Sequence, residues 1–195
     1  TVNILEFARK NPVRSLVFLS TMEVYGTPGN DEKITEKHGT DIDPMQVRSS
    51  YPESKRICEN LCASYAQEYG IPAKVIRLTQ TFGPGAAYGD GRVFAEFARC
   101  VIEQKDIVLH TRGETKRSYL YTADAVSAVL CVLLKGENGE AYNAANEETY
   151  CTIREMAELA ADSLAEGKIR VVFDLAEDIQ KYGYAPVLQI GRAHV

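Results

Sequence analysis

A tyrosine and a lysine four residues apart are the strongest candidates for chemistry in this sequence. Tyr51 and Lys55 fall in a segment whose apolar residues recur at helical spacing, so both side chains should project from one face of a helix. An ammonium group near a phenol favours the phenolate, which can remove a proton from a hydroxyl group. The pair therefore suits oxidation of an alcohol, in which a hydride leaves the same carbon. With 11 tyrosines in the chain, the alternative is a chance pair on a solvated helix.

A second group of polar residues directly follows an apolar run. Residues 16–19 are all apolar, as is typical of a strand buried on both faces of a parallel sheet. Ser20, Thr21 and Glu23 come next, at the carboxyl end of that strand, where ligands bind in open α/β sheets. The alternatives are that Thr21 caps the strand end and that Glu23 is a solvated loop charge.

Strands and helices must alternate along the chain to position these residues. After a first helix within residues 1–11, the patterns predict strands at 73–78, 107–109, 141–143 and 169–173, and helices at 51–69, 92–104, 123–134 and 152–164. Gly70 is expected at a helix C-cap, and Thr152 with Glu155 is expected to form a capping box. Residues 27–49 read as a long polar loop. This alternation predicts an α/β sheet with crossover helices.

Composition excludes several classes of protein. The 195 residues carry 22 Lys and Arg against 27 Asp and Glu and are 45% hydrophobic, which argues against disorder, collagen-like repeats and a disulfide scaffold. The net charge of -5 and the lack of a long apolar run lead us to expect no nucleic-acid partner and no membrane span. Five cysteines, an odd number, indicate reduced thiols and a cytoplasmic location. Cys58 and Cys62 share a helical face, but no further Cys or His pair stands nearby, so we expect core packing and no metal site.

Taken in order, the motifs resemble those of one enzyme family. They are Ser-Thr-x-Glu-Val-Tyr-Gly at 20–26, Tyr-x-x-x-Lys at 51–55, Phe-Gly-Pro at 82–84, Gly-Arg-Val at 91–93 and Arg-Ser-Tyr-x-Tyr-Thr-x-Asp at 117–124. Each motif is weak alone, but this order is similar to that of the extended short-chain dehydrogenase/reductase family, in particular its NAD-dependent nucleotide-sugar epimerases, dehydratases and decarboxylases. The resemblance extends to about Gln189.

The resemblance implies roles for the residues at the strand end and on the helix. Tyr51 would be the catalytic base toward the sugar hydroxyl, and Lys55 would tune Tyr51 and bind the nicotinamide ribose of NAD. Thr21 would share the proton path, and Glu23 would be an acid/base carboxylate. Ser20 would lie against the cofactor.

The resemblance also implies substrate-binding residues. Gln80 would contact substrate phosphate, and Arg92 and Arg117 would grip the nucleotide diphosphate, a task that suits the bidentate guanidinium. Surface salt bridges are the alternative for both arginines. Asp124 is expected to cap the following helix.

Three departures from the family pattern matter. No glycine-rich phosphate-binding turn follows a strand anywhere in the sequence, although the family keeps one in its first βαβ unit. Met22 stands where sugar 4,6-dehydratases carry an Asp, which disfavours dehydration, and it is not the small hydroxyl residue usual in the decarboxylases either. Gln80 stands where Asn is common, so the amide would reach further.

These features give the expected architecture. We expect an α/β protein with a partial Rossmann-type doubly wound parallel sheet, lacking its N-terminal half, and a smaller C-terminal α/β substrate lobe. Residues 1–91 would form the C-terminal half of the dinucleotide-binding domain, and 92–189 mostly the substrate lobe, with some segments returning to the sheet. Residues 190–195 resemble a translated sequencing adapter, with a genuine tail as the alternative. The isolated chain is expected to be inactive and not to bind NAD.

The implied activity is oxidation of a nucleotide-diphosphate sugar at C4 with NAD, followed by epimerisation or decarboxylation and return of the hydride. Residues 89–93 and 117–119 look most like those of UDP-glucuronate decarboxylases, while the rest fits an epimerase equally well. The alternatives are a non-catalytic dinucleotide-sensing protein of the same fold and a purely structural domain. Family members commonly dimerise through a four-helix interface that includes the Tyr-x-x-x-Lys helix, so the resemblance also implies a homodimer.

Overall fold

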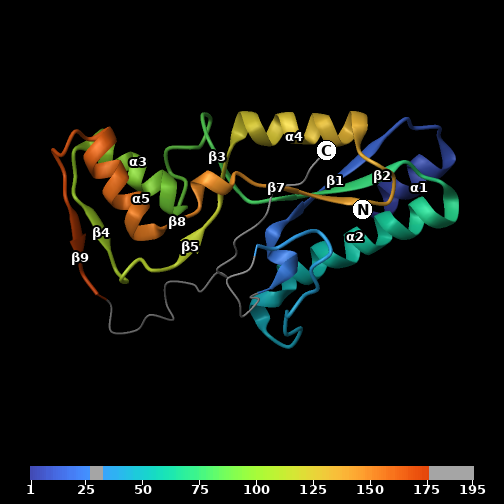
Figure 1. Ribbon diagram of the computed structural model, residues 1–195, viewed down its shortest axis with the longest axis horizontal. Coiled ribbons are helices and arrows are strands. Elements are labelled where there is room, and N and C mark those ends of the chain that lie inside the picture. Colours follow the sequence, from blue (N-terminus) through green and yellow to red (C-terminus); the bar gives the residue numbers. More distant parts are fainter. Residues whose placement is uncertain (27–32, 176–195) are drawn as a thin grey trace.

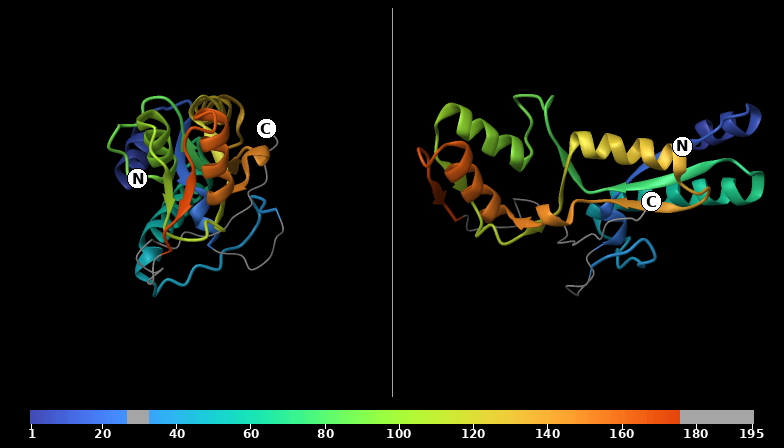
Figure 2. Two further views of the ribbon diagram at one scale, coloured as in Figure 1. Left: turned by 90° about the vertical axis from the view of Figure 1, so that its left-hand side faces the viewer. Right: turned by 45° about the horizontal axis from the view of Figure 1, so that its top comes forward.

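The computed structural model describes residues 1–26 and 33–175. A three-stranded parallel sheet with its helices occupies one end of the described part, and a smaller group of helices and short strands occupies the other (Figure 1). The right-hand view in Figure 2 shows the same elongated arrangement, and the left-hand view looks along its long axis. The residues predicted to be an adapter scar, 190–195, lie outside the described part.

The larger sheet contains the strands that the apolar runs predicted. Its order is β1 (Leu16–Thr21), β2 (Ala73–Leu78) and β7 (Ala141–Ala144), all parallel. Their carboxyl ends therefore lie at one edge of the sheet, and β1 is an outer strand among the described residues. This confirms the predicted α/β class with a parallel sheet.

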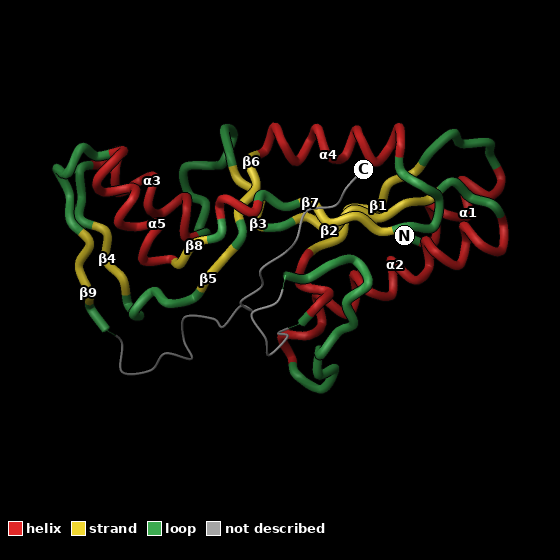
Figure 3. Tube along the Cα trace, viewed as in Figure 1, coloured by secondary structure: helices red, strands yellow, loops and turns green. Residues whose placement is uncertain are grey.

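Helices cover both faces of this sheet. Helix α2 (Ser50–Tyr69) packs on one face and α4 (Thr122–Lys135) on the other, while α1 (Val2–Lys10) packs against α2 (Figure 3). Helix α2 ends where predicted, at Gly70, whose φ of 66° is left-handed and favours glycine. Apolar residues fill the space between each helix and the sheet. Leu5, Cys62 and Val75 belong to the core on the α2 side, and Ile76 and Val132 to the core on the α4 side.

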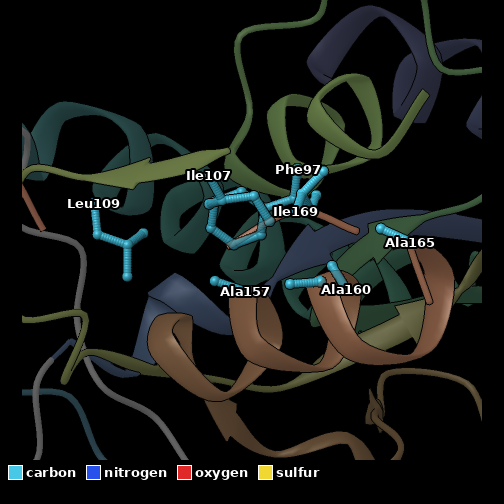
Figure 4. Packing of buried hydrophobic residues seen from close by; sticks show 8 residues of the cluster. Phe97, Ile107, Leu109, Ala157, Ala160, Ala165 and Ile169 are labelled. Atoms are coloured by element: carbon cyan, nitrogen blue, oxygen red, sulfur yellow. The ribbon is translucent and has the colours of Figure 1, made fainter. Parts of the chain in front are cut away.

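The smaller lobe is built around α3 (Val93–Glu103) and α5 (Ile153–Leu159). Strand β4 (Ile107–Leu109) pairs in parallel with β9 (Val171–Phe173) beside them. Figure 4 shows how the large side chains of the core, Phe97 and Ile107, meet a row of small alanines on α5 and the turn after it.

Several short strands and turns were not predicted. Strands β3 (Gln80–Phe82) and β6 (Tyr119–Tyr121) pair in parallel, and β5 (Lys116–Arg117) pairs antiparallel with β8 (Cys151–Thr152). Short 3-10 turns span Met22–Tyr25, Val47–Ser49 and Glu147–Thr149. Strands of two or three residues are too short to show periodicity, and pairing with distant residues selects them.

One local prediction is confirmed with a change and another is wrong. The helix predicted over 152–164 is present as α5 followed by a π-helical turn at Ala160–Leu164, in which the backbone amide of Ala165 donates to the carbonyl of Ala160 at 3.1 Å. Asp124 does not cap α4, because the helix already begins at Thr122 and Asp124 lies within its first turn. The capping box of Thr152 and Glu155 is confirmed.

The cysteines are free thiols. Cys62 is 1% exposed in the core under α2, and its burial raises its pKa to about 11, so this thiol is unreactive at neutral pH. Within residues 1–26 and 33–175, no cluster of three His, Cys, Asp or Glu residues is placed to hold a metal ion. None of the helices in the described part is both long and apolar enough to cross a membrane.

Candidate active site

The Tyr51–Lys55 pair lies at the carboxyl edge of the parallel sheet. The first turns of α2 carry both residues, and the Lys55 ammonium lies 5.9 Å from the centre of the Tyr51 ring. Lys55 Nζ also donates a 2.9 Å hydrogen bond to the carbonyl oxygen of Leu19 on β1 and lies 5.1 Å from the Phe18 ring centre. Tyr51 is 43% exposed. The structure thus brings the predicted base and its ammonium together on an open surface.

Ser20 lies next to this pair but faces the sheet interior. It is 5% exposed, and its hydroxyl donates a 2.5 Å hydrogen bond to Oε1 of Glu59 on α2. Its predicted role against the cofactor stays a prediction, and the structure adds a contact with α2 that sequence reasoning missed.

Thr21 and Glu23 lie where β1 passes into the 3-10 turn Met22–Tyr25. The Thr21 hydroxyl accepts a hydrogen bond from the amide of Glu23 at 3.3 Å, so Thr21 caps this turn. Met22 is 6% exposed and belongs to the core beneath the turn, which places its thioether away from solvent.

Glu23 belongs to a cluster of charges drawn from three segments. Its carboxylate forms a 3.0 Å salt bridge with Nη2 of Arg48, from the turn just before α2. Arg117 of β5 is buried and interacts electrostatically with both residues. Burial lowers the pKa of Arg117, and the nearby charge of Arg48 lowers it further. Tyr119 and Glu23 act to raise this pKa. Two guanidinium groups beside one carboxylate leave local positive charge, which suits an anionic ligand.

Arg48 is a candidate that sequence reasoning missed. It lies three residues before Tyr51 in the long polar loop, where a lone arginine reads as solvated. Its spacing from Tyr51 was the available signal, because a residue just before a helix lies close to the side chains of the first turn.

The other two predicted substrate residues occupy different settings. Gln80 begins β3, where its backbone N–H donates to the backbone carbonyl of Ser118 at 3.2 Å. Arg92, just before α3, is about half exposed and pairs with Asp90 at 2.5 Å. This pairing lowers the pKa of Asp90 to about 2. Arg92 therefore has a carboxylate partner already, and its contact with a diphosphate stays a prediction.

Two cavities lie on opposite faces of the sheet, and Tyr51 and Lys55 line neither. One of about 330 Å³ lies on the α2 side and is bordered by Tyr25, His38, Glu59 and Arg77. The other, of about 840 Å³, lies between α4 and β7. The Tyr51–Lys55 surface lies outside both cavities, and Tyr51 is open to solvent.

Comparison with known proteins decides the family. Residues 1–145 match the model of the NAD dependent epimerase/dehydratase family. The chain belongs to this family. The match includes Thr21, Tyr51, Lys55 and Arg117, so the residues that carried the resemblance lie within it.

Curated relatives and solved structures agree. The chain is 31% identical over 133 residues to UDP-glucuronic acid decarboxylase 1 of Xenopus tropicalis, covering 68% of this chain and 31% of that protein. It is 30% identical over 179 residues to UDP-glucuronic acid decarboxylase 6 of Arabidopsis thaliana, covering 91% of this chain and 51% of that protein. A dTDP-glucose 4,6-dehydratase from Bacillus anthracis, solved in complex with NAD, superposes with a TM-score of 0.79 at 27% identity, over 98% of this chain and 57% of that one. The chain thus spans about a third to a half of the curated relatives, and the Rossmann-type fold is a partial one.

Proposed function

We propose that this chain is the catalytic and substrate-binding part of an NAD-dependent enzyme that oxidises a nucleotide sugar at C4 and then epimerises or decarboxylates it. One observation carries the proposal: the Tyr51–Lys55 pair lies at the carboxyl end of parallel strand β1, with the Lys55 ammonium on the Leu19 carbonyl. This edge of an open α/β sheet is where ligands bind.

The residues present fit the nicotinamide end of the cofactor. Lys55 would hold the ribose hydroxyls and keep a positive charge near Tyr51, and Tyr51 would take the proton of the sugar C4 hydroxyl. Thr21 would hydrogen-bond the same hydroxyl. NAD, when bound, supplies a reversible hydride acceptor, and the protein provides orientation and proton transfer.

The charge cluster supports a uronic-acid form of the sugar. Arg48 and Arg117 together outweigh Glu23, so the site would attract the diphosphate and a carboxylate at C6. Once C4 is a ketone, the C6 carboxylate can leave as carbon dioxide. A thioether has no acidic proton, so Met22 supplies no proton donor at that position for dehydration.

We also propose that a further nucleotide-binding segment completes the site. Strand β1 has an all-apolar stretch at 16–19 yet lies at the edge of the described sheet, and Leu19 is 47% exposed. Parallel strands of this composition are normally buried on both sides. Hydride transfer needs a site that excludes water, whereas Tyr51 is open.

A homodimer in the cytoplasm is the expected state of the enzyme. Ile4 and Phe7 on α1 and Ile57 on α2 are each more than 60% exposed, and the two helices pack side by side. A second copy of this apolar surface would bury them. The five free cysteines support a reducing compartment.

The deciding experiment is turnover by the parent enzyme with its complete nucleotide-binding domain. UDP-glucuronate, UDP-glucose and UDP-N-acetylglucosamine would be incubated with NAD, and products would be identified by mass spectrometry and NMR. Loss of carbon dioxide indicates a decarboxylase, and an isomer of equal mass indicates an epimerase. Tyr51→Phe should lower kcat by about 10²–10⁴-fold, and Tyr69→Phe at the end of α2 is the control.

Calorimetry tests the need for the further segment, and turnover separates the proposed enzyme from its alternative. The isolated 195 residues should show no measurable NAD binding, and tight binding would contradict the need for a further segment. A non-catalytic dinucleotide-sensing protein would, in its complete form, bind NAD without turning over any sugar nucleotide. The presence of both Tyr51 and Lys55 favours the enzyme.

A further inference from the structure

A row of polar side chains crosses the face of the sheet that α2 covers. Ser20, Arg77 and Asn143 are register partners on β1, β2 and β7, so their side chains share the face that α2 covers. Ser20 is 5% and Asn143 3% exposed. Two residues earlier on each strand, the same face carries an apolar row of Phe18, Val75 and Ala141. The polar row therefore lies at the end of the sheet that carries the candidate site.

Helix α2 reaches this row through Glu59. Its carboxylate accepts a 2.5 Å hydrogen bond from the Ser20 hydroxyl. The same carboxylate forms a bidentate ion pair with Arg77, whose Nη2 donates to Oε2 at 2.6 Å and whose Nε donates to Oε1 at 3.0 Å. Both side chains of the ion pair are less than 15% exposed. Tyr25, which is buried, accepts from Arg77 Nη1 at 2.8 Å and donates to Asn143 Oδ1 at 2.7 Å.

Two neighbouring contacts join α2 to β1. Lys55 and Glu59 are one helical turn apart, and they contact Leu19 and Ser20, which are adjacent on the strand. A slide of α2 along β1 by one residue would break both contacts at once. Thr21 is the next residue of the strand, so the same two contacts fix where the catalytic helix stands relative to it.

We propose that Glu59 and Arg77 are positioning residues: their buried ion pair, tied to Ser20 and Tyr25, holds α2 in the register that places Tyr51 and Lys55 against the carboxyl end of β1. The inference rests on the proposed function. Glu59 and Arg77 touch neither substrate nor cofactor in this scheme, and they act through Lys55 and Tyr51.

Stability alone does not account for this arrangement. Removing two charges from water costs about as much as their attraction returns, and well-packed apolar residues can replace a buried ion pair without loss. Burial by itself would lower the pKa of Arg77, but its interactions with Glu59 and Tyr25 raise it above the usual value, so the guanidinium stays charged. An apolar replacement would lack directional contacts. The hydrogen bonds of Glu59 and Arg77 specify one position of α2 along β1, which apolar packing alone would not specify.

The test, in the parent enzyme, compares a variant that leaves a buried charge unpaired with a variant that removes both charges and their hydrogen bonds. Glu59→Gln leaves Arg77 buried without a carboxylate, so both the melting temperature and kcat should fall. The double variant Glu59→Leu with Arg77→Met should regain the melting temperature, because no charge is left unpaired. Its kcat should stay about 10–100-fold low, since a misplacement of about 1 Å can cost that much, while KM for the sugar nucleotide stays within about twofold.

Hydrogen exchange gives a readout that does not depend on turnover. Amides of residues 50–55 and 19–21 should exchange faster in the double variant than in the wild type, measured on the parent enzyme. Glu53→Gln, which removes the exposed i,i+3 ion pair with Arg56 on the same helix, is the matched control and should change neither exchange nor kcat.

Wild-type exchange and wild-type kcat in the stable double variant would overturn the inference. If the double variant does not fold, Glu59→Gln decides, assayed well below its own melting temperature: a lowered kcat at unchanged KM supports the inference, and an unchanged kcat overturns it. A wild-type enzyme without any turnover would instead reject the proposed function, and the exchange comparison would still decide the register.

Discussion

Lys55 and Leu19 are joined by a 2.9 Å hydrogen bond from the ammonium to a backbone carbonyl. A backbone acceptor at the end of a strand cannot change with its side chain, so the position of the cation depends on how the sheet and α2 pack. The same ammonium lies 5.9 Å from the Tyr51 ring centre. The electrostatic environment of the proposed base is therefore set by the fold.

Lys55→Met tests this relationship in the parent enzyme. The variant keeps an unbranched apolar side chain but removes the ammonium, which lies 5.1 Å from the Phe18 ring centre and donates to the Leu19 carbonyl. We expect kcat to fall by about 10²–10⁴-fold, because the proposed base loses the cation beside it. Steady-state kinetics with a sugar nucleotide and NAD would measure it. Lys37→Met, at an exposed loop position, is the control, and a similar kcat in both variants would contradict the assignment.

Glu23→Gln tests the charge cluster. The variant keeps the shape of the side chain while leaving Arg48 and Arg117 without the carboxylate. If Glu23 moves a proton at the sugar, kcat should fall by about 10²–10⁴-fold with little change in KM. If it is only a partner of Arg48, the effect should be small, because salt bridges to a half-exposed arginine contribute about 0–1 kcal/mol.

Two controls separate these outcomes for Glu23. Glu158→Gln removes an exposed i,i+4 pair with Arg154 in the smaller lobe and should leave kcat unchanged. Arg48→Gln removes the partner and a proposed anion-binding group but keeps the carboxylate, so it should raise KM and retain a higher kcat than Glu23→Gln. The reverse order would reject Glu23 as the acid/base group.

The helix that carries Tyr51 and Lys55 was predictable because its signals are local. Periodic apolar residues define α2, and Gly70 ends it. The same holds for strands β1 and β2, whose apolar residues need no distant partner to be recognised. Local pattern was thus enough to place the strand end and the Tyr–Lys face in one region.

Contacts between segments distant in sequence were not predictable. Glu23 forms a salt bridge with Arg48, and a long irregular loop separates the two residues in the sequence. Ser20 donates a hydrogen bond to Glu59 because α2 packs back over β1. Strand β3 is three residues long and exists through its pairing with β6. In each case the partner is chosen by packing, and periodicity carries no information about it.

Phe7→Glu tests the proposed dimer. Phe7 is 61% exposed on α1, next to α2, and a carboxylate there would be buried unpaired in a four-helix interface. We expect the parent enzyme to shift from dimer to monomer in sedimentation equilibrium. Ile102→Glu, at a 70% exposed position on α3 in the smaller lobe, should leave the mass unchanged. A dimeric Phe7→Glu variant with wild-type affinity would place the interface elsewhere.

Lys74→Met tests the cost of a buried charge in β2. Lys74 is 4% exposed; its ammonium donates to the Ser15 hydroxyl at 2.9 Å, and no carboxylate of the described part lies within salt-bridge distance. Burial lowers its pKa below the ordinary 10.5, so we expect Lys74→Met to be more stable at pH 7 by about 1 kcal/mol.

Between the lowered pKa of Lys74 and 10.5 the unfolded chain binds more protons than the folded one, so wild-type stability rises with pH there. The advantage of the variant should therefore shrink as pH approaches 10.5. Urea denaturation at pH 7 and pH 10 would measure this, with exposed Lys135→Met as control, and an advantage that is equal at both values would show that burial does not lower the pKa of Lys74.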